Sequence, residues 1–119
     1  MAPVTPSHTP LSSEGEVRVF AYVESNLQGN RTVALSHRNT FNLDLGFVAK
    51  VPDGFELVFD LMPEFKERGL EVYKSTLRGE GRAYLSLRNL GREIVQIRHQ
   101  EAVATVRIVP VYELTFKVN

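Results

Sequence analysis

The stretch "EVYKSTLRGEGRAYLSLRNLG", residues 71 to 91, decides the fold because a period-two pattern runs on both sides of a glycine-rich corner. Aliphatic and polar residues alternate from Arg82 to Arg88, which is typical of a half-buried β-strand. Gly79 and Gly81 separate this strand from an extended segment before it, and glycine suits a tight corner because it tolerates positive φ. The stretch therefore predicts strand, turn, strand.

Similar alternation extends through most of the chain. In residues 16–24, Val17, Val19, Ala21 and Val23 share one face. The remaining predicted strands are 31–37, 40–51, 55–61, 70–76, 82–89, 93–99, 102–109 and 111–118. Strands that recur about every 8–12 residues predict an all-β sandwich or barrel.

Glycine and proline mark the interruptions within and between these strands. In the strand over 40–51, Phe41, Leu43 and Leu45 are predicted to share the buried face, and Gly46 predicts a bulge or bend. The sequence "VPDG" at 51–54 predicts a turn, since proline fixes φ and Asp-Gly suits a hairpin.

One short helix is predicted within "MPEFKERG", residues 62–69. Pro63 fits the first helical position, Asp60 or a neighbour would lie near the N-cap, and Gly69 fits the position after the C-cap. The helix would interrupt an otherwise all-β chain.

Composition bounds the classes of function. The 119 residues include 14 Lys and Arg and 14 Asp and Glu, so the formal net charge is zero, and we expect neither a nucleic-acid nor a membrane partner. Cysteine is absent, which excludes disulfides, thiolate metal sites and a cysteine nucleophile. With 43% hydrophobic residues the chain can bury a modest core, which oligomerisation would supplement.

Residues 1–15, "MAPVTPSHTPLSSEG", are predicted to form an N-terminal arm that precedes one β domain over 16–119. The arm alternates Pro with Ser and Thr, which favours extended or disordered structure. Two interpretations are open: a flexible tail, or an arm that becomes ordered against a partner subunit or larger assembly. It has no basic start and no apolar core, so it does not predict a signal peptide.

No pattern of catalytic or metal-ligating residues is found. His8, His37 and His99 lie in unrelated contexts without the spacing of metal ligands, so we interpret them as surface or loop residues and predict no metal or cofactor. The serines lack a nucleophile-elbow motif, and "RGEGR" lacks the lysine and spacing of a phosphate-binding loop.

Arginines form the most informative pattern. Between Ser75 and Arg107 the chain has no lysine and six arginines, at 78, 82, 88, 92, 98 and 107. In the strand over 82–89, one face carries a polar stripe of Arg82, Tyr84, Ser86 and Arg88. This stripe predicts a solvated face, a subunit interface or a phosphate-binding patch, because Arg and Tyr are favoured at interfaces and Arg binds phosphate in a bidentate manner. The candidate residues are Arg78, Arg82, Tyr84, Arg88 and Arg92.

Five segments carry a resemblance to a known family. In order along residues 31–111, they are "LGFVAKVPDGFELVF", "GLEV", "LRGE", "LSLRNLG" and "EAVATVRIVPV". The succession of VPDG, RGE and NLG resembles the trimeric dUTPase family of the dUTPase/dCTP deaminase β-clip superfamily. The resemblance implies an all-β, jelly-roll-like barrel or β-clip with one short helix, assembled as a homotrimer.

The resemblance fails at the residues that would carry dUTP hydrolysis. Where the family has a phosphate-contacting Arg-Ser pair, this chain has Met62 and Pro63. The Asp that activates the attacking water aligns with Lys74, a cation at neutral pH, and the Tyr beneath the deoxyribose aligns with Leu77. In the family's "GDRIAQ" motif, Asp, Arg and Gln align with Glu101, Ala102 and Thr105. The family's Gly-rich C-terminal motif is also missing.

These departures predict a non-enzymatic structural or interaction protein on a dUTPase-like trimeric scaffold. We favour a soluble phage capsid decoration protein whose N-terminal arm engages the assembly, located at the virion surface or in the host cytoplasm. One alternative is a nucleotide-binding sensor or sequestering protein, in which Arg78, Arg82, Arg88 and Arg92 contact phosphate. Another is an active dUTP or dCTP hydrolase with displaced catalytic residues.

Overall fold

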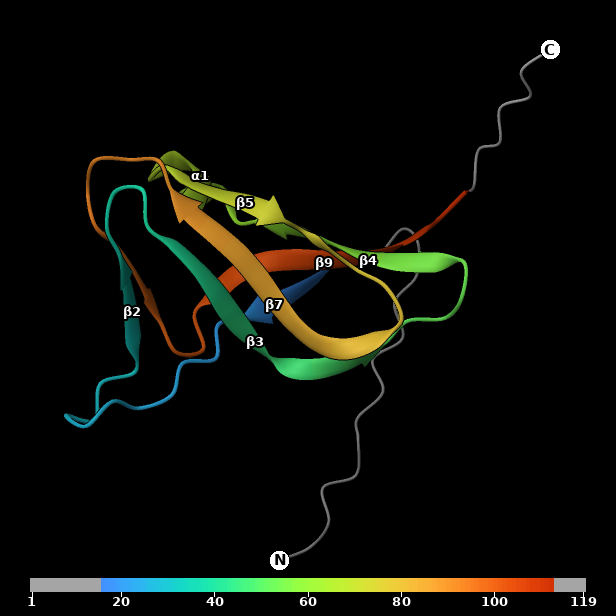
Figure 1. Ribbon diagram of the computed structural model, residues 1–119, viewed down its shortest axis with the longest axis horizontal. Helices are drawn as coiled ribbons and strands as arrows, with labels where there is room; N and C mark the ends of the chain where they lie inside the picture. The colour runs from blue at the N-terminus through green and yellow to red at the C-terminus, as the bar shows by residue number, and fades with distance from the viewer. Residues whose placement is uncertain (1–15, 113–119) are drawn as a thin grey trace, which may run out of the picture.

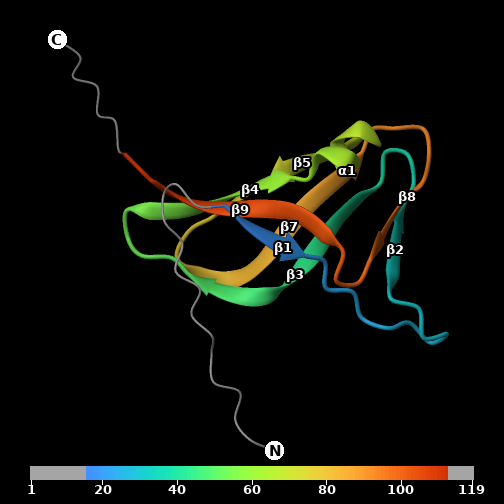
Figure 2. The ribbon, with the colours of Figure 1, turned by 180° about the vertical axis from the view of Figure 1, so that it is seen from behind.

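Two antiparallel sheets form the layers of a sandwich, and a two-stranded sheet closes one end (Figures 1 and 2). The computed structural model describes residues 16–112. One layer has the order β1-β9-β4-β6, with β1 (Val17–Phe20), β9 (Ala102–Pro110), β4 (Phe55–Leu61) and β6 (Thr76–Leu77). The other has the order β3-β7-β5, with β3 (Thr40–Lys50), β7 (Glu80–Asn89) and β5 (Leu70–Lys74). The end sheet pairs β2 (Thr32–Leu35) with β8 (Val95–Arg98).

Each strand predicted between residues 16 and 110 has a counterpart, but the one predicted over 16–24 is shorter, at Val17–Phe20, and the one over 70–76 divides into β5 and β6. The all-β architecture and the single helix, α1 (Pro63–Glu67), also agree with the expectation. The proposed arm at 1–15 and most of the strand predicted at 111–118 lie outside the described residues. No helix in the described part of the chain is long and apolar enough to cross a membrane.

The core lies between the two layers and is supplied by the apolar alternation of the central strands. Ala83, Leu85 and Leu87 of β7 are fully buried, while the polar residues between them, apart from Ser86, face outward. From the opposite layer, Phe59 of β4 and Val103 of β9 are equally enclosed. The face predicted for residues 17–23 is confirmed, since its apolar residues join the same core.

Phe41 is an exception to the predicted burial pattern. Leu43 and Leu45 are buried as expected, but Phe41 remains 39% exposed. Alternation assigns a residue to a face of the strand, whereas burial also requires a layer opposite that residue. Gly46 confirms the predicted bulge, because its φ is +79° and the β3–β7 register shifts beside it.

The helix starts where predicted but has a different cap. Its N-cap is Met62, which makes no side-chain capping bond, and Asp60 remains within β4. Phe65 anchors the helix in the core with 1% exposure. Gly69 follows the C-cap with φ +98°, as expected for a residue that ends a helix in a left-handed conformation.

Asn89 joins three segments at the end of the sandwich near β2 and β8. This fully buried side chain donates from Nδ2 to the carbonyl oxygens of Leu35 (2.8 Å) and Glu93 (2.9 Å). Its Oδ1 accepts a hydrogen bond from the amide of Gly91 at 2.9 Å. Gly91 in turn packs directly on the backbone of Gly69. The Asn89 side chain therefore provides hydrogen bonds to backbone groups that an irregular loop cannot pair by itself.

Candidate functional site

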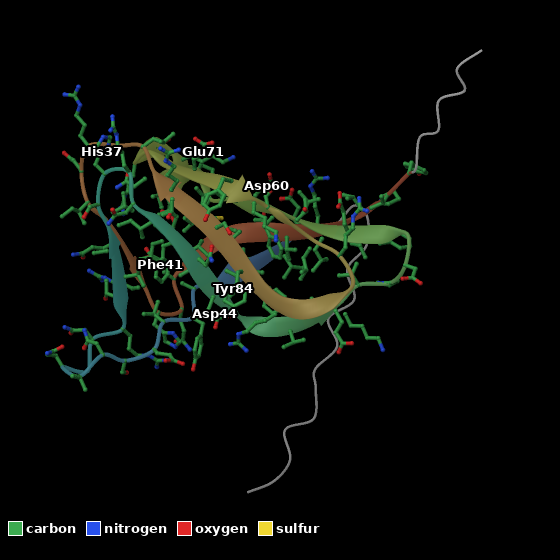
Figure 3. The ribbon with its side chains drawn as sticks, in the orientation of Figure 1. His37, Phe41, Asp44, Asp60, Glu71 and Tyr84 are labelled. Atoms are coloured by element: carbon green, nitrogen blue, oxygen red, sulfur yellow. The ribbon has the colours of Figure 1, made fainter. Side chains whose placement is uncertain are left out.

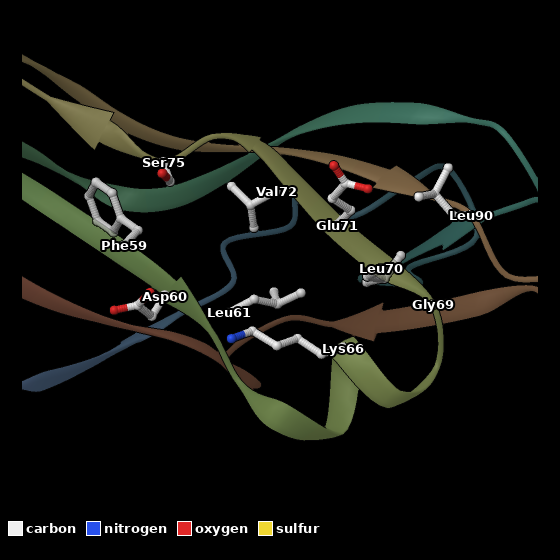
Figure 4. A pocket seen from close by; sticks show the side chains of 10 residues that line it. All are labelled: Phe59, Asp60, Leu61, Lys66, Gly69, Leu70, Glu71, Val72, Ser75 and Leu90. Atoms are coloured by element: carbon white, nitrogen blue, oxygen red, sulfur yellow. The ribbon is translucent and has the colours of Figure 1, made fainter.

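A concave site with a cavity of about 510 Å³ lies between β4 and β5. It forms because the chain changes sheet at Ser75. β6 pairs with β4, and the Phe59 amide donates to the Ser75 carbonyl at 2.8 Å, whereas β5 pairs with β7 in the other layer. From Ser75 toward α1, β4 and β5 diverge and leave a wedge-shaped cavity between them, which we call the wedge (Figure 4).

The wedge has an apolar floor and a mixed polar rim. Its lining residues are Phe59, Asp60, Leu61, Lys66, Gly69, Leu70, Glu71, Val72, Ser75 and Leu90. The Lys66 amine reaches toward β4, whereas the Glu71 carboxylate points away from it (Figure 4). Asp60 lies 3.6 Å from Arg107 Nε, which opposes its charge. The wedge could hold a small amphipathic molecule, with Lys66 as its single cationic side chain.

The second concave site joins two of the motifs found in the sequence. The turn at 52–55 and the corner at 78–79 line a pocket of about 250 Å³ together with Val111. The Val51 amide donates to the Gly79 carbonyl at 2.8 Å, and Arg78 Nε pairs with Glu56 Oε2 at 3.1 Å. The charged corner at residues 78–82 is thus the junction of two turns, and Arg78 binds a carboxylate of its own chain.

The five candidate residues do not converge on one pocket. Arg82, Tyr84 (labelled in Figure 3) and Arg88 lie on the outer face of β7, as the alternation predicted, but Ser86 is only 8% exposed. Arg78 lies at the second pocket, and Arg92 occupies the exposed loop before β8. Within one chain, the set predicted to contact phosphate is therefore divided among three places.

Arg82 is held by an acidic partner that sequence reasoning did not find. Its Nε donates to both Asp44 oxygens, at 3.0 and 2.9 Å. This hydrogen bond raises the pKa of Arg82 above its ordinary value, so the guanidinium stays charged. Arg82 and Arg31 each lie 5.9 Å from the centroid of the Tyr22 ring. The sequence signal for this ion pair is Asp44, an acidic residue within the apolar alternation of β3.

His99 completes this cluster as a structural residue. Its Nδ1 accepts a hydrogen bond from the Val23 amide at 3.1 Å, and its ring meets Tyr22 edge-on. Desolvation, with a smaller contribution from Arg31, lowers the pKa of His99 and keeps the imidazole neutral, as an acceptor requires. His37 is exposed in the loop before β3, with Nδ1 2.7 Å from the Gly91 carbonyl oxygen. Among residues 16–112, no group of three acidic or histidine side chains could hold a metal ion.

Solved structures of phage dUTPases superpose on this chain. A mutant dUTPase of phage phi11 of S. aureus matches with a TM-score of 0.69 and 13% identity, over 90% of this chain and 84% of that one. A Staphylococcus bacteriophage 80alpha dUTPase mutant, solved with dUpNHpp, matches with a TM-score of 0.69 and 12% identity, over 98% and 88%. Another phi11 dUTPase structure matches with a TM-score of 0.68 and 13% identity, over 98% and 88%.

No protein-family model and no curated protein matches the sequence. The similarity is therefore one of three-dimensional arrangement, at an identity too low to transfer an activity. It agrees with the order of motifs read from the sequence. The chain has the dUTPase-like fold.

Proposed function

We propose that the protein is a non-enzymatic structural or binding protein on a dUTPase-like scaffold. The observation that carries the proposal is the chemistry of β5 and its surroundings. By the resemblance, Lys74 at the end of β5 aligns with the expected general base, and a protonated amine cannot accept the proton of an attacking water. Asp60, the carboxylate on the β4 side of the wedge, is opposed by Arg107. Glu71, the carboxylate on the β5 side of the wedge, points away from β4 (Figure 4).

Incubation with dUTP or dCTP and magnesium tests this proposal. We expect no pyrophosphate release above a protein-free blank, with a working dUTPase as positive control. Robust turnover would refute it. A thermal-shift measurement on the same samples separates binding from catalysis, since a ligand that binds the folded state raises the melting temperature.

Nucleotide binding without hydrolysis is the second candidate function. The wedge favours it, because about 510 Å³ is within the usual range for small-molecule pockets and Lys66 could contact a phosphate. A melting-temperature rise with dUTP, absent from a Lys66→Ala variant, would support this candidate. No shift at millimolar nucleotide would exclude it.

We further propose that the protein assembles as a homotrimer and decorates a phage capsid. The dUTPase-like fold and the phage origin of the similar structures support this proposal. So do the large apolar side chains left on the surface, among them Val48 and Ile94 at 61% and 63% exposure. In this function residues 1–15 attach the protein to the capsid.

Deletion of residues 1–15 tests the role of the arm. Light scattering should give three times the mass of one chain for the full and the shortened protein. Only the full chain should co-sediment with capsids of the phage that encodes it. A scrambled 1–15 segment is the matched control for length and composition. Unchanged co-sedimentation of the shortened protein would refute the proposal.

A further inference from the structure

Three of the four tyrosines lie on one open surface, the outer face of the β3–β7–β5 sheet and the segment beside it. Tyr22, Tyr73 and Tyr84 are 38%, 56% and 48% exposed. Neither concave site includes any of the three. We name this surface, with Asn42, Asp44, Arg82 and Ser86 between the rings, the tyrosine face; Figure 3 labels its Asp44 and Tyr84.

Tyr73 lies flat across the sheet. The β5–β7 register shifts between Val72 and Lys74, and this irregularity includes Tyr73. Its hydroxyl comes within 3.5 Å of Asn42 Oδ1 on β3, so the side chain spans the intervening strand β7. Beneath it, Ser86 is only 8% exposed, and its Oγ donates to the same Asn42 oxygen at 2.9 Å. The Tyr73 side chain therefore reaches across β7 and remains 56% exposed, which leaves ring surface open to a ligand.

Tyr84 and Tyr22 continue the surface on either side of Asp44. Asp44 faces Tyr84 in the β3–β7 register and forms a bridge with Tyr22. The Tyr22 ring is fixed by two guanidinium groups and by the edge-on contact of His99. The Tyr22 ring is therefore held before any ligand arrives, which limits the entropy lost on binding.

The charges of the tyrosine face are arranged mainly as opposite pairs. Arg82 bonds both oxygens of Asp44, and Arg88 lies opposite Glu71 in the β5–β7 register. The exposed Lys74 beside Tyr73 adds one cation opposite Ser86. A polyanion would meet two carboxylates here, and a polycation would meet two guanidinium groups. The complementary ligand is uncharged but rich in hydrogen-bonding groups, since the paired side chains still offer free donor and acceptor positions.

We propose that the tyrosine face binds a neutral oligosaccharide of hexose units. A hexose ring has an apolar C–H face suited to an exposed aromatic ring and a rim of hydroxyls that donate and accept hydrogen bonds. Tyr73 and Tyr84 provide stacking surfaces on neighbouring strands. Asn42, Asp44 and Arg82 lie between them as hydroxyl partners. A flat sheet face also admits an extended chain, which a closed pocket would exclude.

Affinity electrophoresis of the full chain in gels containing dextran, galactomannan or mixed-linkage β-glucan tests the proposal. We expect retardation by at least one polysaccharide. Tyr73→Ala and Tyr84→Ala should each weaken the retarding affinity tenfold or more, whereas Tyr73→Phe should preserve it. Tyr112→Ala is the matched control, because Tyr112 is 86% exposed and lies outside the tyrosine face. Urea unfolding midpoints must be unchanged for each variant compared.

Several results would overturn the proposal. One is no retardation by any of the three polymers, and another is retardation that the tyrosine variants leave unchanged. Binding of oligodeoxythymidine with a steep salt dependence, lost in the same variants, would assign the face to a polyanion instead. A change in oligomeric mass in Tyr73→Ala or Tyr84→Ala would assign it to subunit contact.

Discussion

Replacing Asn89 with leucine should lower the free energy of unfolding by about 2–4 kcal/mol, measured by urea denaturation followed by circular dichroism. Leucine has similar bulk but cannot donate to Leu35 and Glu93 or accept from Gly91, the three contacts that Asn89 makes at 2.8–2.9 Å. Each buried polar group left without a partner costs about 1–3 kcal/mol, and the carbonyl of Leu35 is the most enclosed of the three.

Asn39→Leu is the matched control, because Asn39 is exposed in the turn before β3. We expect this surface change to alter stability by less than about 0.5 kcal/mol. If Asn89→Leu cost no more than the control, the three-way junction would not contribute to stability. A lower m-value would instead indicate that the end sheet had detached.

Gly69→Ala should cost about 2–5 kcal/mol, from the combined effects of overpacking and an unfavourable φ. A Cβ at Gly69 would come 2.6 Å from the Gly91 amide nitrogen. The two atoms nearest to this Cβ both belong to the Gly91 backbone, which cannot move aside without shifting the chain. The residue also has φ +98°, where side chains are strained. The thermal midpoint of unfolding should fall by ten degrees or more on the order-of-magnitude scaling for a chain of this size.

Gly54→Ala separates the two causes. Gly54 has a similar φ of +84° but no atom within 4 Å of the added Cβ, so it reports the conformational cost alone. We expect about 1 kcal/mol for that change. Equal losses at both positions would show that the Gly69–Gly91 contact is unimportant, whereas a larger loss at Gly69 measures the contact itself.

Local pattern was sufficient to predict most of the fold. The alternation over 82–89 gave both the strand and its buried face, and Gly46, Gly54 and Gly69 all have the positive φ that their contexts indicated. These features depend on near neighbours in the chain. The succession of turns then allowed the dUTPase-like fold to be identified at an identity of only 12–13%.

Features that depend on distant partners could not be read in this way. The segment 70–76 was predicted as one strand, but it divides at Ser75 because its two halves pair in different sheets. That division produces the wedge. Asn89 resembled an ordinary turn residue in "NLG" until its burial was known. Likewise, the arginines were found from the sequence, but the carboxylates that hold Arg78 and Arg82 lie 22 and 38 residues away.

The order β1-β9-β4-β6 has a consequence for biosynthesis. β1 is the first described strand to leave the ribosome, yet its only sheet partner is β9, the last, with Val17 opposite Val106. The layer cannot close until β9 has been synthesised, and the unpaired edges of β1 and β4 must wait for the strand that lies between them. Such long-range pairing slows folding and extends the period in which unpaired edges can aggregate. This layer is therefore expected to close only once β9 has emerged, and until then a chaperone or a second chain could shield those edges.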